Sequence, residues 1–254
     1  LALLAVPLAI AGAAGAADPR QSGKRAGTEF LGPALKSQQA DDGANPGMLW
    51  VEDGKALWRT PAGPSAKSCA DCHGADMAGM RGVAARYPAV DSATGDLLNL
   101  EQRIERCRTR HQGAEPFGYE TQPLLAMTAL LAHRSRGAPI SASIDGPARK
   151  YYEAGRSFFE TRQGQLDLAC GQCHDDNVGK KLRGDTISQG HPTGYPIYRL
   201  EWQTLGSLHR RLRACSLGVR AQVLPYGAPE YVALELFLAD RARGLAIETP
   251  AVRR

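Results

Sequence analysis

The spacing Cys-x-x-Cys-His occurs twice in the sequence, at residues 69–73 and 170–174. At this spacing two thiols can add to the vinyl groups of one haem while the adjacent imidazole reaches the iron. A single copy also fits a zinc half-site or a redox dithiol. A zinc ribbon, however, uses both of its cysteine pairs on one metal. Two copies, each followed by histidine, therefore predict two covalently bound haem c groups, attached through Cys69, Cys72, Cys170 and Cys173, with His73 and His174 on the irons.

The two remaining cysteines, Cys107 and Cys215, occupy matching places after the two motifs. This symmetry favours a repeated role, in which each thiolate binds the iron of its own haem opposite the histidine. The alternative is a disulfide between them, which an oxidising compartment would allow. Methionine is a common ligand in cytochromes c, but none occurs after residue 127. The other possible ligands are Met127 in the first half, and His191, His209, Lys180 or Lys181 in the second.

The sequence repeats itself around these motifs. Residues 54–58 match residues 155–159 at an offset of 101, and residues 100–107 match residues 208–215 at an offset of 108. Such self-similarity indicates duplication of a unit of roughly 100 residues. We expect a mostly α fold of two tandem cytochrome c-like haem domains with long loops. The domains would span 45–140 and 146–250, the second being catalytic, with turn-rich residues 137–147 as the linker.

Apolar residues spaced three and four apart predict helices that would position the motifs. The segments after each motif are rich in Gly, Asp and Pro and are expected to be loops. No run alternates for long enough to indicate a sheet. Aromatic residues make up only 6% of the 254 residues, so haem would fill cores that are otherwise thin. The predicted helices cover residues 97–111, 124–133, 205–217 and 231–243.

The first 17 residues form an uncharged apolar run that ends in small residues, as the end of a signal peptide does. A membrane anchor is the less favoured alternative, because Pro7 and the small residues weaken the run. No later segment is long and apolar enough to span a membrane. We therefore expect export to the periplasm, with residues 1–17 as a signal peptide remnant and residues 18–44 as an extended N-terminal arm.

The net charge of +5 belongs almost entirely to the second half and is too small to indicate nucleic acid binding. Arg211 lies four residues before Cys215, which places both on one face of a helix. Arg103 has the same relation to Cys107. An arginine at this position can hold an oxyanion through two parallel hydrogen bonds, or it can pair with a haem propionate. The residues alone leave both roles of Arg211 open.

The full pattern resembles the SoxA family, the dihaem subunits of SoxAX cytochrome complexes in sulfur oxidation. The resemblance rests on both Cys-x-x-Cys-His motifs, on Cys107, and on the Arg211-x-x-x-Cys215 segment. It implies an S-thiosulfotransferase that joins thiosulfate oxidatively to a cysteine thiol of the SoxYZ carrier. It also implies iron ligation by His73 with Cys107 and by His174 with Cys215.

The same resemblance assigns a catalytic role to Cys215 and substrate binding to Arg211. A monohaem SoxX-type cytochrome c would form a heterodimer with this chain and accept two electrons. Two other functions share most of these features: plain electron transfer by a dihaem cytochrome c, and thiosulfate dehydrogenation to tetrathionate. A dihaem peroxidase needs an open iron, which two cysteine ligands argue against.

Overall fold

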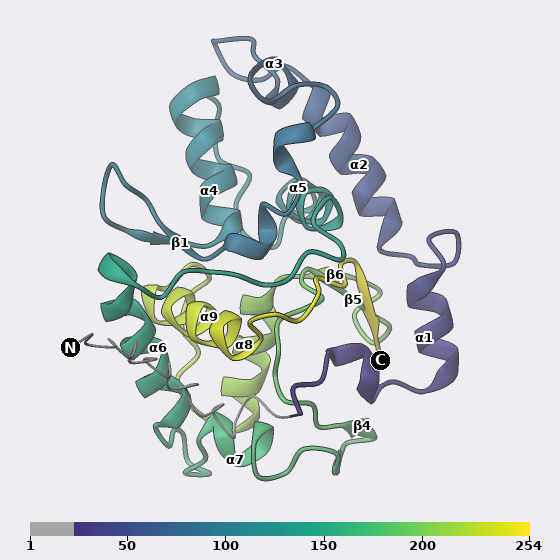
Figure 1. Ribbon diagram of the computed structural model, residues 1–254, viewed down its shortest axis with the longest axis vertical. Helices are drawn as coiled ribbons and strands as arrows, with labels where there is room; N and C mark the ends of the chain where they lie inside the picture. Colours follow the sequence, from purple (N-terminus) through teal and green to yellow (C-terminus); the bar gives the residue numbers. More distant parts are fainter. Residues whose placement is uncertain (1–22) are drawn as a thin grey trace, which may run out of the picture.

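Two crossed helix pairs build the structure, a computed structural model that describes residues 23–254 (Figure 1). Helix α2 (Met48–Arg59) packs across α5 (Gln122–His133), and α6 (Arg149–Glu160) packs across α9 (Pro229–Arg241). The first pair lies in the upper part of Figure 1 and the second in the lower part. The prediction of a mostly helical fold is confirmed. The predicted signal peptide remnant lies outside the described residues.

Glycines occupy the points where the paired helices cross. A Cβ added at Gly54 of α2 would overlap the carbonyl oxygen of Ala126 in α5. A Cβ at Gly155 of α6 would overlap the carbonyl oxygen of Ala233 in α9. The repeated glycine found at an offset of 101 therefore has a packing reason, because only glycine lets these backbones approach so closely.

The remaining helices follow the same order in each half. After α2 come the five-residue helix α3 (Cys69–His73), α4 (Leu100–Cys107) and α5. After α6 come α7 (Cys170–His174), α8 (Leu208–Gly218) and α9. Shorter turns connect them: the 3-10 turns η3 (Ala78–Met80), η4 (Ala84–Arg86) and η6 (Gly146–Ala148), and the π-turn η5 (Arg108–Gln112) after α4.

Two of the predicted helices begin later than expected. Residues 97–98 form a strand, and α4 starts only after Asn99, whose side chain accepts a hydrogen bond from the Gln102 amide at 3.0 Å. Likewise, α8 starts after Ser207, whose hydroxyl accepts from the Arg210 amide at 3.2 Å. These caps satisfy free N–H groups of the first turn, so they set the helix starts more strongly than the apolar spacing does.

Short strands occur where no sheet was expected. Strands of two or three residues are too short to show an alternating pattern in sequence. One hairpin joins β1 (Ala89–Val90) to β2 (Leu97–Leu98), and another joins β3 (Lys181–Leu182) to β4 (Asp185–Thr186). In a third sheet β5 (Ile197–Arg199) lies between antiparallel β6 (Thr204–Gly206) and parallel β7 (Ala251–Arg253).

The described part of the predicted N-terminal arm is not extended throughout. It contains a 3-10 turn, η2 (Gly27–Phe30), and the helix α1 (Pro33–Ala40). It lies along the C-terminal segment of the same chain: the Thr28 amide donates to Glu248, and the Asn45 side chain donates to the carbonyl oxygen of Pro250 at 2.8 Å. The arm therefore joins the start of α2 to the second half (Figure 1).

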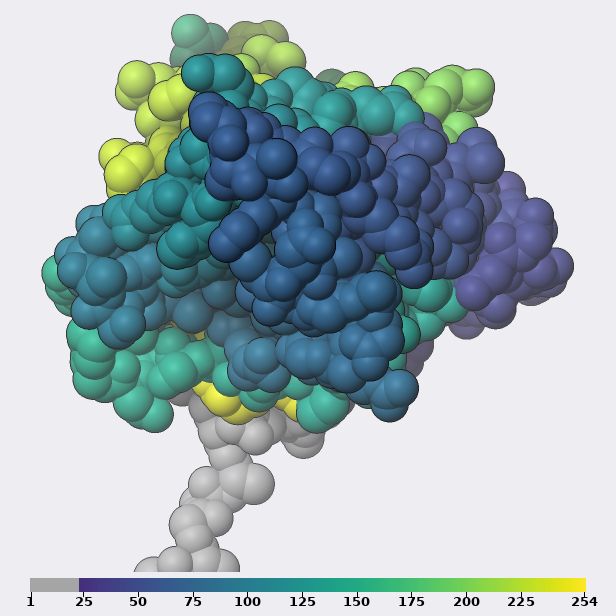
Figure 2. Space-filling model, turned by 90° about the horizontal axis from the view of Figure 1, so that it is seen from above, coloured from purple at the N-terminus to yellow at the C-terminus, as the bar shows by residue number. Residues whose placement is uncertain are grey.

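The two halves share a hydrophobic core. One cluster combines Ala85, Leu97 and Ile140 with Val232 and Leu236 of α9. The linker contributes to it, since the Ile140 amide donates to the carbonyl oxygen of Leu245. Seen from above, green and yellow segments of the second half lie next to teal segments from the end of the first half (Figure 2). Within residues 23–254, no helix is both long and apolar enough to cross a membrane.

Candidate haem sites and active cysteine

Helix α3 holds the first Cys-x-x-Cys-His motif on a single capped turn. The Ser68 hydroxyl accepts a hydrogen bond from the Asp71 amide at 3.2 Å, while the Asp71 carboxylate accepts from the Ser68 amide at 2.7 Å. This reciprocal cap lowers the pKa of Asp71 through the hydrogen bonds from Ser68. One helical turn places Cys69 and Cys72 on the same side, as attachment to one macrocycle requires.

Helix α7 is capped at its N-terminus in a similar way, by different residues. The Gln172 side chain accepts a hydrogen bond from the Ala169 amide at 2.8 Å, in the place that Asp71 takes in the first half. Asp71 and Gln172, between the cysteines of the two motifs, thus cap their helices. The cysteines and histidines take no part in these caps and can bind haem.

The ring of His174 is held by one nitrogen. Its Nδ1 lies 2.7 Å from the carbonyl oxygen of Ser188, which can only accept, so Nδ1 carries the hydrogen. Gly190 closes over the ring at a φ of +73°, and a Cβ there would come within 3.2 Å of the imidazole. With Nδ1 bonded to Ser188, Nε2 is the ring nitrogen that is left to bind a metal. This is the tautomer and orientation that a metal-binding histidine needs.

The thiol of Cys215 faces this histidine from α8. Burial raises the pKa of the thiol, but the hydrogen bond with His174 and the positive charge of Arg211 outweigh burial, so the net shift is downward. Two groups that could bind one iron, the His174 ring and the Cys215 thiol, therefore converge near Cys170, whose pKa is raised by burial and by the charge of Cys215. The residues present fit a haem c that His174 and Cys215 would hold at its iron.

The first half brings together the equivalent residues. Cys107, at the end of α4, lies near enough to Cys69 and Cys72 for their charges to interact. Here burial dominates and raises the pKa of Cys107, and the opposing charge of Arg103 does not reverse it. The two predicted thiolate ligands thus differ, with only Cys215 shifted towards the thiolate.

All six cysteines are free thiols in this structure, so Cys107 and Cys215 are not joined by a disulfide. Each lies with the attachment cysteines of its own half instead.

The two arginines that lie four residues before these cysteines differ in their side-chain partners. Arg103 forms an ion pair with Asp91 at 2.9 Å and donates to the Tyr87 hydroxyl at 3.1 Å. Arg211 has no ion pair or side-chain hydrogen bond within residues 23–254, although the charge of Cys215 helps to raise its pKa against the effect of burial. A half-buried guanidinium without a carboxylate partner is free to bind an anion.

Three residues near Cys215 were missed at the sequence level. Arg199, only 5% exposed, pairs with Asp185 and adds positive charge near the thiol. Tyr195 is half-buried, and burial raises its pKa while the charges of Arg211 and Cys215 act on it in opposite directions. Ser188 anchors His174. These residues lie on loops and on β5, remote in sequence from the motifs, so no spacing could indicate them.

The other ligand possibilities lie elsewhere. Met127 is 2% exposed in the core of the first half. His209 is fully buried with Glu235, at 3.0 Å, and stacks on Tyr119. His191 binds the carbonyl oxygen of Arg25 through Nδ1. In the part of the chain that the structure describes, no three His, Cys, Asp or Glu side chains group together as a metal site.

Comparisons with known proteins agree with this geometry. A family described as SoxA/TsdA, cytochrome c domain, matches residues 53–140. The L-cysteine S-thiosulfotransferase subunit SoxA of Rhodovulum sulfidophilum is 43% identical over 229 residues, covering 90% of this chain and 80% of that protein. The subunit of the same name from Pseudaminobacter salicylatoxidans is 38% identical over 250 residues, covering 98% and 87%.

A solved structure shares the fold over nearly the whole chain. The crystal structure of SoxXA from P. pantotrophus superposes with a TM-score of 0.87 at 35% sequence identity, covering 91% of this chain and 87% of that one. The chain therefore belongs to the SoxA family, the haem c-binding cytochrome subunits of L-cysteine S-thiosulfotransferases in sulfur oxidation.

Proposed function

We propose that Cys215 is the catalytic residue and that Arg211 holds the substrate beside it. The observation that carries this assignment is the pairing of a lowered thiol pKa with an arginine that no carboxylate neutralises, one helical turn away on α8. The equivalent pair in the first half, Cys107 and Arg103, has neither property. The reaction is therefore assigned to the second half.

We infer that each half is a cytochrome c-like domain, at 45–140 and 146–250, and that the chain carries two haem c groups. Cys69 and Cys72 would attach the first, with His73 and Cys107 on its iron. Cys170 and Cys173 would attach the second, with His174 and Cys215 on its iron. Two complete motifs on two capped turns support this count.

The substrate is thiosulfate, and the acceptor is a carrier cysteine thiol of the SoxYZ type. The overall change joins the two sulfurs: thiosulfate and the thiol give a thiol-bound S–SO₃⁻ group, one proton and two electrons. Arg211 binds the sulfonate end through paired hydrogen bonds. This holds the terminal sulfur towards Cys215.

Cys215 divides the reaction into two transfers. Its sulfur, or a persulfide carried on it, bonds to the terminal sulfur of thiosulfate as two electrons leave. The carrier thiolate then attacks that terminal sulfur, the bond to Cys215 breaks, and Cys215 returns as a thiolate. Bound haem supplies the route by which the electrons depart. A SoxX-type monohaem cytochrome c is the proposed partner and acceptor, and the periplasm is the proposed location.

Cys215→Ala tests the assignment, with Cys107→Ala as its matched control. Both variants are made as the complex with the cytochrome partner, and circular dichroism and mass spectrometry check folding and haem content. We expect Cys215→Ala to lose conjugation of thiosulfate to the carrier and Cys107→Ala to retain it. Full activity of a folded Cys215→Ala complex would sink the proposal. Tetrathionate formed without carrier would assign the dehydrogenase reaction instead.

A further inference from the structure

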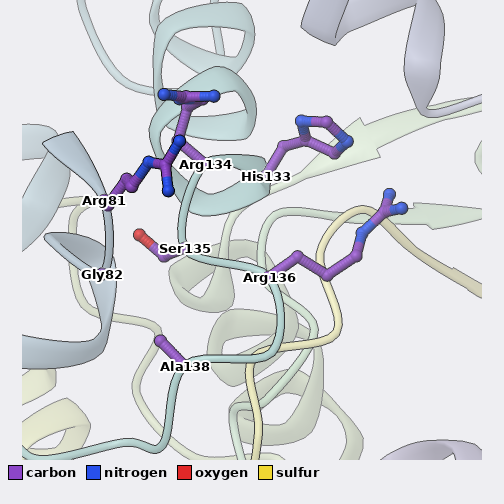
Figure 3. A pocket seen from close by; sticks show the side chains of 7 residues that line it. All are labelled: Arg81, Gly82, His133, Arg134, Ser135, Arg136 and Ala138. Atoms are coloured by element: carbon purple, nitrogen blue, oxygen red, sulfur yellow. The ribbon is translucent and has the colours of Figure 1, made fainter. Parts of the chain in front are cut away.

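A basic cavity of about 320 Å³ lies in the first half, away from all six cysteines. It opens between the turn at Arg81 and Gly82 and the segment 133–138, where α5 ends (Figure 3). Three arginines and one histidine line it, and no carboxylate does. Such an excess of positive charge gives the cavity a positive potential, which attracts anions.

Two of these four basic groups share one carboxylate, Asp42. Arg136 forms an ion pair with Asp42 at 2.7 Å, and His133 faces the same carboxylate at 3.8 Å. Burial and the charge of Arg136 lower the pKa of His133, which favours its neutral form. In Figure 3 both side chains point to the side of the cavity opposite Arg81 and Arg134.

The other two arginines have no anionic partner within residues 23–254. Arg134 donates one guanidinium nitrogen, Nη2, to the carbonyl oxygens of Asp76 and Met77 at 3.2 and 3.4 Å, and its Nε is buried without a partner. Arg81 makes no side-chain hydrogen bond there at all. The head groups of both reach the same side of the cavity (Figure 3). Two like charges that line one cavity repel each other unless an anion lies between them.

The cavity also offers directed donors. The backbone contacts of Arg134 hold its guanidinium in one orientation, so that Nη1 remains free, and the exposed Arg81 can adjust to it. The N–H of the lining residue Gly82 likewise has no hydrogen-bond partner in the described chain. Planar guanidinium groups suit an anion that presents several oxygens on a tetrahedral centre.

We propose that this cavity binds a divalent tetrahedral oxyanion, of the sulfate and thiosulfate class, between Arg81 and Arg134. It is a second anion site, on the half opposite Arg211. Binding at this site involves no redox step. The proposal does not depend on whether Cys215 is catalytic.

Binding is measured by isothermal titration calorimetry on the haem-loaded Arg211→Gln protein, so that the proposed substrate arginine contributes nothing. Sodium sulfate and sodium thiosulfate are titrated separately at low ionic strength, with sodium chloride matched in ionic strength as the blank. We expect saturable binding of one equivalent, and the ratio of the two affinities identifies the preferred anion. No saturation by either anion, or an equal response to chloride, overturns the proposal.

Arg81→Gln is then added, with Arg86→Gln as the matched control. Arg86 is exposed on η4, in the same half but outside the cavity. Loss of one arginine–oxyanion pair is expected to weaken binding about tenfold or more, whereas Arg86→Gln changes it about twofold or less. Arg81→Lys, which keeps the charge without the planar fork, should fall between them. Equal weakening by Arg81→Gln and Arg86→Gln would show general screening and refute the site.

Discussion

Glu101 is a buried carboxyl group at the place where the two halves meet, and replacing it with glutamine should stabilise the protein. It lies in the first turn of α4, near Glu235 of α9. His209 Nδ1 accepts the Gly227 amide at 3.0 Å, so the ring hydrogen sits on Nε2, 3.0 Å from the Glu235 carboxylate. Asn99 also donates to that carboxylate. Glu235 thus has close side-chain partners for its negative charge, whereas the Glu101 carboxyl group has no side-chain hydrogen bond or ion pair within residues 23–254, and the charge of His209 lowers its pKa only in part.

Burial, followed by the negative charge of Glu235, raises the pKa of Glu101 from 4.5 to about 7. The folded protein therefore holds this proton more tightly than the unfolded chain does. The stability that depends on the proton is fully present below pH 4.5 and is lost as the pH rises towards 7. Each pKa unit corresponds to about 1.4 kcal/mol, so the ionisation equilibrium of Glu101 lowers the free energy of unfolding by about 3 kcal/mol at pH 8 and by about 1 kcal/mol at pH 5, where only the unfolded chain loses the proton.

Glu101→Gln keeps the shape of the protonated side chain and removes this cost. The free energy of unfolding is measured by urea denaturation of the haem-loaded protein, followed by circular dichroism. We expect Glu101→Gln to exceed the natural protein by about 3 kcal/mol at pH 8 and by about 1 kcal/mol at pH 5.

The control is Glu52→Gln, on the exposed face of α2 in a surface pair with Lys55. It should change stability by less than about 1 kcal/mol at either pH. A Glu101→Gln protein that is less stable than the natural one at pH 8, or shifted equally at both pH values, would refute the reasoning.

Two further results are expected. Gly155→Ala, which forces α6 away from α9, should lower the free energy of unfolding by about 1–3 kcal/mol in urea, whereas Gly218→Ala, with open space around it, should lower it little or raise it. Arg211→Gln should raise the KM for thiosulfate roughly 10- to 100-fold in the conjugation assay, because a charge-assisted pair is lost. Arg156→Gln removes the same charge from the exposed face of α6, and a comparable rise there would count against a specific role for Arg211.

Haem attachment could be predicted from local spacing, because the thiols and the imidazole that meet one macrocycle must lie within five consecutive residues. The repeat was visible for the same reason: each half has its own motif, its own crossing glycine and its own later cysteine. Apolar spacing predicted four of the α-helices, α4, α5, α8 and α9. It did not give the starts of α4 and α8, since Asn99 and Ser207 set them through side-chain caps.

Only the tertiary structure showed that the two arginine–cysteine pairs have different surroundings. In sequence Arg103 and Arg211 are equivalent, each four residues before a cysteine. In space Asp91 and Tyr87 bind Arg103, while Arg211 lies near Cys215 with no side-chain hydrogen bond or ion pair inside the described range 23–254. Likewise, spacing could not tell that His209 belongs to a buried contact with Glu235. Partners brought together from distant segments decide which of two identical patterns retains an uncompensated charge, and adjacent residues carry no record of that.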